Sequence, residues 1–228
     1  MYVNKKPHRI GVFGGTFDPV HEGHVRLAGY VLRKKLVQEI LFLPAAQPPH
    51  KETAMAPFVH RVAMLKIALT AGSDMSVSTL ESRRCGPSYT VDSLQALQRE
   101  YPGTRLAFLM GADSLMELHQ WFRYSEILHL ADLIVVSRKG ISDRKCTGAI
   151  RRLPGNFFPV SDSRSTFPIF RQTDGGATIY YLGDFSSPVS SSMVRRQLQA
   201  GNRPQGLDKN VFSYIQAHHL YGPQPCAT

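Results

Sequence analysis

The stretch RIGVFGGTFDPVHEGH, residues 9–24, decides how the rest of the chain is interpreted. Its first part, Arg9–Gly14, is a short apolar run ending in two glycines, which predicts a buried strand followed by a tight turn. From Glu22 to Leu36 apolar side chains recur at helical spacing, which predicts a helix. A strand that turns directly into a helix is the opening unit of an α/β fold.

The same alternation of strands and helices continues along the chain, which predicts an α/β fold with a mostly parallel sheet. Pro57 is expected to be the first residue of the next helix, whose apolar side is expected at Val59, Val62, Ala63, Ile67 and Leu69. The other expected strands are Glu39–Leu43, Ser76–Leu80, Arg105–Met110, Asp132–Ser137 and Thr178–Leu182. The other expected helices are Thr90–Tyr101, Ser114–Trp121, Ser125–Ala131, Ser192–Ala200 and Asp208–His219, the last of them capped by Asp208.

Length and composition favour one globular domain over residues 1–228. Hydrophobic residues make up 43% and charged residues 19%, which is too apolar for a disordered chain. No apolar run approaches the roughly 20 residues of a membrane helix, and the polar N-terminus does not resemble a signal peptide. Three widely spaced cysteines, Cys85, Cys146 and Cys226, argue against a disulfide framework and favour a cytoplasmic location.

The net charge of +10 suggests anionic partners, which could be nucleic acid, a membrane surface or small phosphorylated substrates. Much of the excess lies between Arg138 and Arg171, where eight basic residues accompany two acidic ones. Residues 140–176, which overlap this stretch, lack a clean period, so an irregular basic insertion is expected there. An ordinary solvent-exposed basic loop would show the same excess of Lys and Arg.

The chemistry of the opening stretch points to phosphate. Two glycines let a ligand approach the backbone closely, and the helix that follows offers unpaired N–H groups and a positive dipole end. His21 and His24 are three residues apart and therefore share one face of that helix. The chain has neither GxGxxG nor a P-loop, so histidines and backbone amides would have to bind the phosphate.

Two other interpretations of the same residues remain open. The segment could be a turn with two surface histidines and no ligand. Alternatively, His21, His24 and Asp18 could bind a metal, although structural zinc usually has four ligands and no cysteine lies nearby in the sequence.

The motif Gly14–His24 closely resembles the first signature of the HxGH nucleotidyltransferase superfamily, and Val189–Arg195 (VSSSMVR) resembles its second signature, ISSTxxR. Intermediate motifs are similar to those of the bacterial-type nicotinate mononucleotide adenylyltransferases. These are Pro48–Lys51 (PPHK), Pro87–Leu94 (PSYTVDSL), Gly111–Leu115 (GADSL) followed by Trp121, and Asp132–Arg138 (DLIVVSR). The resemblance spans Arg9 to Leu220 and is weakest over residues 140–176.

This resemblance implies a Rossmann-like doubly wound sheet with helices on both faces, completed by a C-terminal helical part at residues 190–222. It also implies the reaction of ATP with nicotinate mononucleotide to give deamido-NAD and pyrophosphate, with Mg²⁺ accompanying ATP. No protein metal site, nucleic acid or membrane partner is expected, and no pattern in the chain predicts an oligomeric state.

The resemblance also assigns residues to roles. His21 and His24 would be catalytic. ATP would be bound by these two together with Gly15, Thr16, Phe17, Gly111, Asp113, Arg138, Ser190, Ser191, Ser192 and Arg195. Nicotinate mononucleotide would be bound by His50, Lys51, Ser88, Tyr89, Thr90 and Trp121.

Several of these residues have ordinary structural interpretations as well. Trp121 could be core, Asp113 and Ser190–Ser192 could be helix caps, and His50 with Lys51 could belong to an exposed loop. For the whole chain, the nearest rival activity is that of pantetheine-phosphate adenylyltransferase, and glycerol-phosphate cytidylyltransferase is a more distant rival. The non-enzyme rival is a basic nucleotide- or RNA-binding module, although no RNP-type or KH-type motif supports it.

Overall fold

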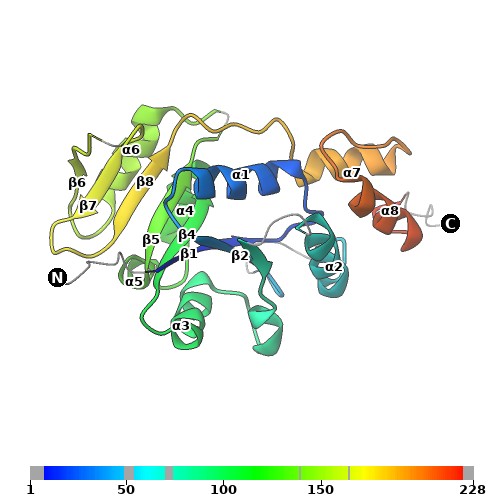
Figure 1. Ribbon diagram of the computed structural model, residues 1–228, viewed down its shortest axis with the longest axis horizontal. Helices are drawn as coiled ribbons and strands as arrows, with labels where there is room; N and C mark the ends of the chain where they lie inside the picture. Colours follow the sequence, from blue (N-terminus) through cyan, green and yellow to red (C-terminus); the bar gives the residue numbers. More distant parts are fainter. Residues whose placement is uncertain (1–7, 49–53, 70–73, 139, 164, 223–228) are drawn as a thin grey trace, which may run out of the picture. The chain divides into compact units, whose positions relative to one another are not determined.

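A computed structural model describes residues 8–48, 54–69, 74–138, 140–163 and 165–222 of the chain (Figure 1). His50 and Lys51 lie outside the described residues. The chain divides into two compact units. Unit 1 comprises Met1–Gly14, Leu36–Ile40 and Tyr89–Ser186, and unit 2 comprises Gly15–Lys35, Leu41–Ser88 and Ser187–Thr228.

The strands are hydrogen-bonded in the order β3-β2-β1-β4-β5-β8-β7-β6. The pairs β1–β4, β4–β5 and β5–β8 are parallel, whereas β8–β7 and β7–β6 are antiparallel. This order confirms the expected α/β fold with a mostly parallel, doubly wound sheet. The bounds are β1 Arg9–Gly15, β2 Glu39–Pro44, β3 Met75–Val77, β4 Arg105–Gly111, β5 Ala131–Val136, β6 Phe157–Val160, β7 Ile169–Gln172 and β8 Thr178–Leu182.

The centre of unit 1 is the parallel pair β4–β5, whose register places Gly111 opposite Val136 at the carboxyl ends of the two strands. All six residues of β5 are buried, as expected for a strand inside a parallel sheet. Helix α3 packs against α5, and α4 packs against α6 (Figure 1). The helices are α3 Thr90–Glu100, α4 Ala112–Glu117, α5 Tyr124–Leu130 and α6 Asp143–Arg152, with a 3-10 turn η2 at Leu118–Gln120.

A buried carboxylate ties together the starts of the unit 1 strands. Asp132, 1% exposed, accepts hydrogen bonds from Arg9 and Arg105, each at 2.8 Å, and from the backbone N–H of Thr178 at 2.9 Å. The hydrogen bond to Asp132 raises the pKa of the Arg105 guanidinium. This cluster lies at the amino ends of β1 and β4, at the opposite edge of the sheet from Gly111.

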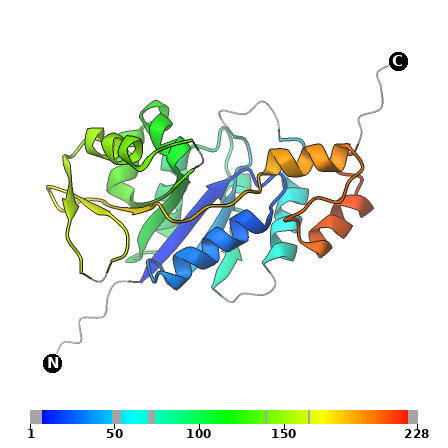
Figure 2. The same ribbon diagram turned by 90° about the horizontal axis from the view of Figure 1, so that it is seen from above.

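Unit 2 contains the helices α1 Glu22–Arg33, α2 Phe58–Ala68, α7 Ser191–Gln199 and α8 Lys209–Ala217, with a 3-10 turn η1 at Leu80–Arg83. Helix α2 packs against α8, and Figure 2 shows the two side by side in cyan and red. Asp208 caps α8, as expected from its position before an apolar period. No helix in the described residues is both long and apolar enough to cross a membrane.

The expected apolar side of the helix after Pro57 is only partly correct. Val62 and Leu69 are buried, but Val59 is 66% exposed, and Arg61 is buried in its place. The Arg61 guanidinium is accommodated because Nε donates to the carbonyl of Ala56 at 3.1 Å and Nη1 donates to that of Thr16 at 2.7 Å. Pro57 itself occupies the N-cap position and not the first helical turn.

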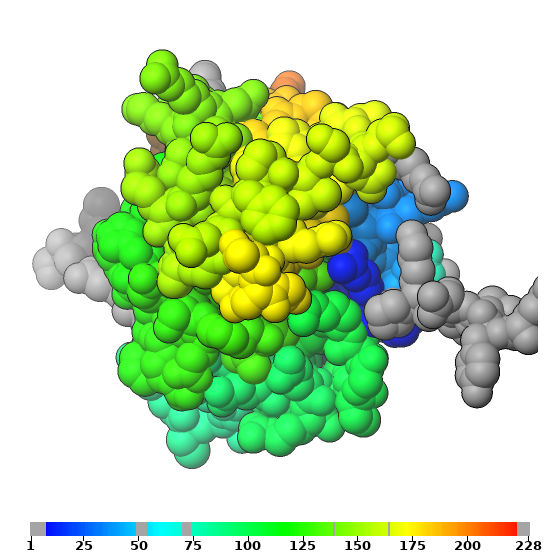
Figure 3. Space-filling model, turned by 90° about the vertical axis from the view of Figure 1, so that its left-hand side faces the viewer, coloured from blue at the N-terminus to red at the C-terminus, as the bar shows by residue number. Residues whose placement is uncertain are grey.

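Two further expectations differ from the structure. Residues 140–176, expected to be irregular, contain α6, β6 and β7. Figure 3 shows atoms of this segment at the surface, in yellow-green to yellow. Strands of four residues are too short to produce a recognisable period, and Pro159 lies in β6, the last strand in the order. The strand expected at Ser76–Leu80 ends at Val77, and Leu80 begins η1.

Candidate active site

The two signature histidines form the start of helix α1. His21 is the N-cap residue, and its Nδ1 accepts the backbone N–H of Gly23 at 3.1 Å. The Nδ1 of His24 accepts the backbone N–H of His21 at 3.3 Å. Because a ring nitrogen that accepts a hydrogen bond carries no proton, each neutral imidazole has its N–H at Nε2. The helix start therefore provides two imidazole donors next to its positive dipole end.

Packing defines the orientation of these rings. The two imidazoles stack with their centroids 3.8 Å apart, and the edge of His24 meets the ring of Phe17 with 5.0 Å between centroids. Phe17 is buried and has a φ of 50°. A Cβ on Gly15 would lie 3.0 Å from the Phe17 ring, so the second glycine of the motif lets the chain pass close to this aromatic side chain.

The second signature lies against the first within unit 2. The Oγ of Ser191 donates to the carbonyl of Pro19 at 3.0 Å, and Nη1 of Arg195 donates to the carbonyl of Asp18 at 2.6 Å. Nη2 of Arg195 contacts Ser192 Oγ at 3.4 Å. Ser190 does cap α7, because its Oγ accepts the N–H of Met193. The capping interpretation thus holds for Ser190 and does not account for Arg195.

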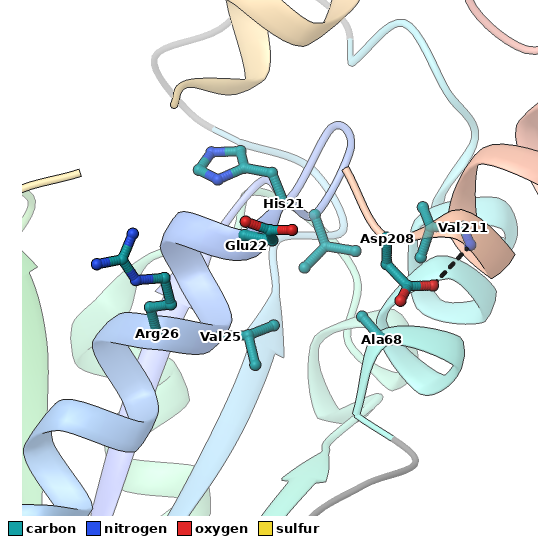
Figure 4. Close-up of a pocket in the computed structure, with 8 residues that line it drawn as sticks. His21, Glu22, Val25, Arg26, Ala68, Asp208 and Val211 are labelled. Carbon is teal, nitrogen blue, oxygen red and sulfur yellow. Dashed lines mark hydrogen bonds between the residues drawn. The ribbon is translucent and has the colours of Figure 1, made fainter. Parts of the chain in front are cut away.

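Unit 2 contains a pocket of about 260 Å³ that is lined in part by His21. In Figure 4 the ring of His21 points away from Asp208 and Ala68, which lie across the pocket. The carboxylate of Asp208 is held by its capping bonds to the N–H groups of Asn210 and Val211. The lining residues are Val20, His21, Glu22, Val25, Arg26, Ala68, Asp208 and Val211.

In unit 1, three of the expected ATP residues lie together at the carboxyl ends of β4 and β5. Gly111 is the N-cap residue of α4, and Asp113 is the second residue of that helix. Asp113 is therefore not the helix cap that one interpretation suggested. The carboxylate of Asp113 lies 3.5 Å from Arg138 Nε, and both side chains are more than half exposed. A Cβ on Gly111 would come within 2.7 Å of Arg138 Nε, so only glycine leaves this pair undisturbed.

The aromatic side chains of unit 1 include a residue that the sequence analysis did not single out. Trp121 is half-buried and meets Phe108 edge to face at 6.1 Å, so it is not simply core. Tyr89, at the N-cap of α3, packs on Phe122 with 4.5 Å between centroids. Phe122 is 48% exposed, which is unusual for a large aromatic side chain. In the sequence, its position next to the motif residue Trp121 was the signal that could have identified it. Thr90 is the first residue of α3.

Ser88, an expected contact for the mononucleotide, belongs to unit 2 and has a structural role there. Its Oγ accepts the N–H groups of Ala46 and Gln47, each at 3.0 Å, and its own N–H donates to the carbonyl of Gln47. Ser88 therefore shapes the loop that leads toward residues 49–53.

The metal interpretation finds no support in the part of the chain that the structure describes. No group of three or more His, Cys, Asp or Glu side chains there is arranged to hold a metal ion. The carboxylate of Asp18, considered above as a ligand beside the two histidines, instead accepts the N–H groups of Met55 and Ala56.

Comparison with known proteins places these features in a family. Residues 12–197 match the family model described as Cytidylyltransferase-like. A relative from Gloeobacter violaceus, named a probable nicotinate-nucleotide adenylyltransferase, is 36% identical over 93% of this chain and 96% of its own. One from Syntrophotalea carbinolica with the same name is 35% identical over 95% of this chain and 98% of its own.

Solved structures show the same fold. The nicotinic acid mononucleotide adenylyltransferase of Plasmodium falciparum complexed with NaAD superposes with a TM-score of 0.71 at 18% identity, covering 94% of this chain and 97% of that one. The same enzyme complexed with APC gives a TM-score of 0.69 with the same coverage.

Proposed function

The chain belongs to the cytidylyltransferase-like family and, within it, to the nicotinate-nucleotide adenylyltransferases, and we propose that it transfers the adenylyl group of ATP to nicotinate mononucleotide. The products are deamido-NAD and pyrophosphate, in a step of NAD biosynthesis. One observation carries the proposal from the structure. Two stacked imidazoles, each with its N–H at Nε2, stand at a helix start, and a motif arginine donates to the carbonyl of Asp18, three residues before the first of them.

This set of donors suits adenylyl transfer. The attacking phosphate oxygen is already an anion, so no general base is required, and catalysis consists of positioning and stabilisation of charge. Charge builds up on the oxygens around the α-phosphorus and on the departing pyrophosphate as the bond to it breaks. Imidazole N–H groups, hydroxyls and a guanidinium are all donors that can stabilise that charge.

Within unit 2 we assign His21 and His24 to the ATP phosphates as the catalytic pair. The amides and side chain of the turn at Gly15, Thr16 and Phe17 would hold phosphate beside them. The outgoing β,γ-phosphates would be bound at the start of α7. The residues proposed there are Ser190, Ser191, Ser192 and Arg195.

Within unit 1 we assign Gly111 and Asp113 to the ribose of adenosine, because an exposed carboxylate can accept hydrogen bonds from both ribose hydroxyls. Arg138 would bind nucleotide phosphate. Nicotinate mononucleotide is assigned to a separate group of residues, namely His50, Lys51, Ser88, Tyr89, Thr90 and Trp121. Backbone N–H groups at the start of α3 would favour the carboxylate of nicotinate over an amide.

We propose Mg²⁺ as the ion that accompanies ATP. The donors assigned to phosphate are N–H and O–H groups and a guanidinium, which bind oxygens and not a hard cation. ATP oxygens and water would therefore hold the ion, as Mg²⁺ prefers. The ion would neutralise charge on the triphosphate.

The wide spacing of the cysteines supports a reducing compartment, so we place the reaction in the cytoplasm.

The decisive experiment mixes purified protein with ATP, Mg²⁺ and either nicotinate or nicotinamide mononucleotide, and measures dinucleotide by chromatography and pyrophosphate by a coupled assay. We expect both products, with a higher kcat/KM for the nicotinate substrate. A parallel reaction with 4′-phosphopantetheine tests the nearest rival activity. Failure to form dinucleotide from either mononucleotide would overturn the proposal, and an RNA gel shift in that protein would favour a binding module.

A further inference from the structure

The carboxylate of Asp18 is buried inside the first signature and joins three distant parts of unit 2. Its side chain is 7% exposed. Oδ1 accepts the hydroxyl of Tyr221 at 2.6 Å and the N–H of Ala56 at 3.1 Å, and Oδ2 accepts the N–H of Met55 at 2.9 Å. The second-signature Arg195 places Nη1 3.9 Å from Oδ2.

Tyr221 is the unexpected member of this cluster, because it lies beyond every motif in the sequence. The residue is 6% exposed and has a φ of 60°, so the chain turns sharply after α8 to bring the ring inward. Burial, and then the hydrogen bond to Asp18, raise the pKa of the Tyr221 phenol. The phenol therefore remains a donor to the carboxylate at neutral pH.

Arg195 is held between two kinds of partner. It donates to the backbone carbonyl of Asp18 at 2.6 Å and contacts Ser192 Oγ at 3.4 Å, while its ion pair with the Asp18 carboxylate stays long at 3.9 Å. The guanidinium side chain is 24% exposed, so an incoming phosphate can reach it. A short bidentate bridge to Asp18 would use the donors that a phosphate needs.

We propose that Tyr221 is a positioning residue for the phosphate-binding arginine, acting through Asp18. The Tyr221 hydroxyl satisfies Oδ1 and offsets part of the carboxylate charge, which leaves Arg195 on the backbone carbonyl and available to an anion. Without that hydroxyl, the Asp18 carboxylate would attract the Arg195 guanidinium into a direct ion pair and would compete with the triphosphate for it. This inference rests on the proposed role of Arg195 in binding ATP.

The test is the variant Tyr221→Phe, which keeps the buried ring and removes the hydroxyl. We expect KM for ATP to rise about tenfold, the size typical of one charge-assisted hydrogen bond, with KM for nicotinate mononucleotide nearly unchanged. The affinity for inorganic tripolyphosphate, measured by calorimetry, should fall by a similar factor. The matched control is Tyr214→Phe, which removes an α8 hydroxyl that contacts His60 Nδ1 at 3.0 Å and should leave both quantities unchanged.

A double variant separates positioning from simple loss of structure. If Tyr221 acts through Asp18, adding Tyr221→Phe to Asp18→Asn should change KM for ATP no further than Asp18→Asn alone, because the two residues share one effect. Multiplicative effects, or a Tyr221→Phe enzyme with the parental KM and tripolyphosphate affinity, would overturn the inference. A parental protein that makes no dinucleotide would instead overturn the proposed function, and the tripolyphosphate measurement would still test Tyr221.

Discussion

The imidazoles of His21 and His24 stack at 3.8 Å with 27° between their planes. Each accepts a backbone N–H at Nδ1, so the fold at this helix start determines which ring nitrogen carries the proton. Two residues that are adjacent on one helix face thereby become a pair of donors with a defined orientation.

Replacing His24 by alanine should therefore remove a transition-state donor while the fold survives. We expect kcat to fall by about 10²–10³-fold, the cost typical of losing one such donor. The measurement is steady-state kinetics beside thermal unfolding followed by circular dichroism. His129→Ala removes an exposed histidine of α5 and serves as the control. Near-parental turnover in His24→Ala would remove His24 from the catalytic role.

His21 has two separable roles, since it caps α1 as well as presenting a donor. His21→Ser keeps a side-chain oxygen that can cap the helix and removes the imidazole. We expect its melting temperature to stay near the parental value while kcat falls. His21→Ala should lose kcat and also about 1 kcal/mol of stability. Equal stability of the two variants would show that the capping bond to Gly23 contributes little.

Asp132 should matter for stability and not for catalysis. Asp132→Asn leaves Arg9 and Arg105 facing each other without their shared anion, and breaking such a buried pair costs about 3 kcal/mol. Urea unfolding would measure the loss, and kcat at 25 °C should be unchanged because the cluster lies at the opposite edge of the sheet from Gly111. Asp74→Asn, at an exposed position, is the control. A large fall in kcat in a folded Asp132→Asn protein would contradict this.

The buried thiol of Cys146 should be unreactive and should make stability depend on alkaline pH. Burial raises its pKa to about 11. At pH 8, iodoacetamide should therefore modify the exposed Cys85 and spare Cys146 in native protein, as peptide mass spectrometry would show. The folded state favours the neutral thiol, so this stabilisation is present below about pH 9 and is lost toward about pH 11.

The variant Cys146→Ala isolates that contribution, because the buried phenols Tyr181 and Tyr221 also have raised pKa values and add to the same slope. We expect the free energy of unfolding to fall less steeply above pH 9 in the variant than in the parent. Identical slopes would mean that the Cys146 thiol does not titrate differently in the folded and unfolded chains.

The basic helix α6 offers a test of whether the positive net charge of the protein helps to attract its anionic substrates. Arg151 and Arg152 are exposed on a helix that packs against α4, which carries Asp113. The double variant Arg151→Gln/Arg152→Gln should raise KM for ATP or for the mononucleotide at low ionic strength and lose that effect above about 0.5 M salt, because screening shortens the reach of surface charge. Arg99→Gln on α3 is the control. No change at any ionic strength would leave α6 as solvated surface.

The sequence patterns predicted the order of elements well where their period was long. The strands around Val12 and Ile134, the helix that starts after His21 and the cap at Asp208 all lie where the patterns indicate. The patterns failed where a tertiary partner reverses a local preference. Arg61 is the clearest case, because an arginine on an apolar helix face looks exposed until backbone carbonyls are found to accept its donors.

By itself, the sequence determined the α/β class, the two histidines on one helix face and the pairing of two signatures that are far apart in the chain. These follow from spacing along one element or from motif residues that are adjacent in sequence. Folding of the whole chain was needed to bring Asp18 against Tyr221, to set Arg195 on a backbone carbonyl and to pair Asp113 with Arg138. Such contacts join residues far apart in the chain, and burial then decides which of their charges are satisfied, so no local pattern encodes them.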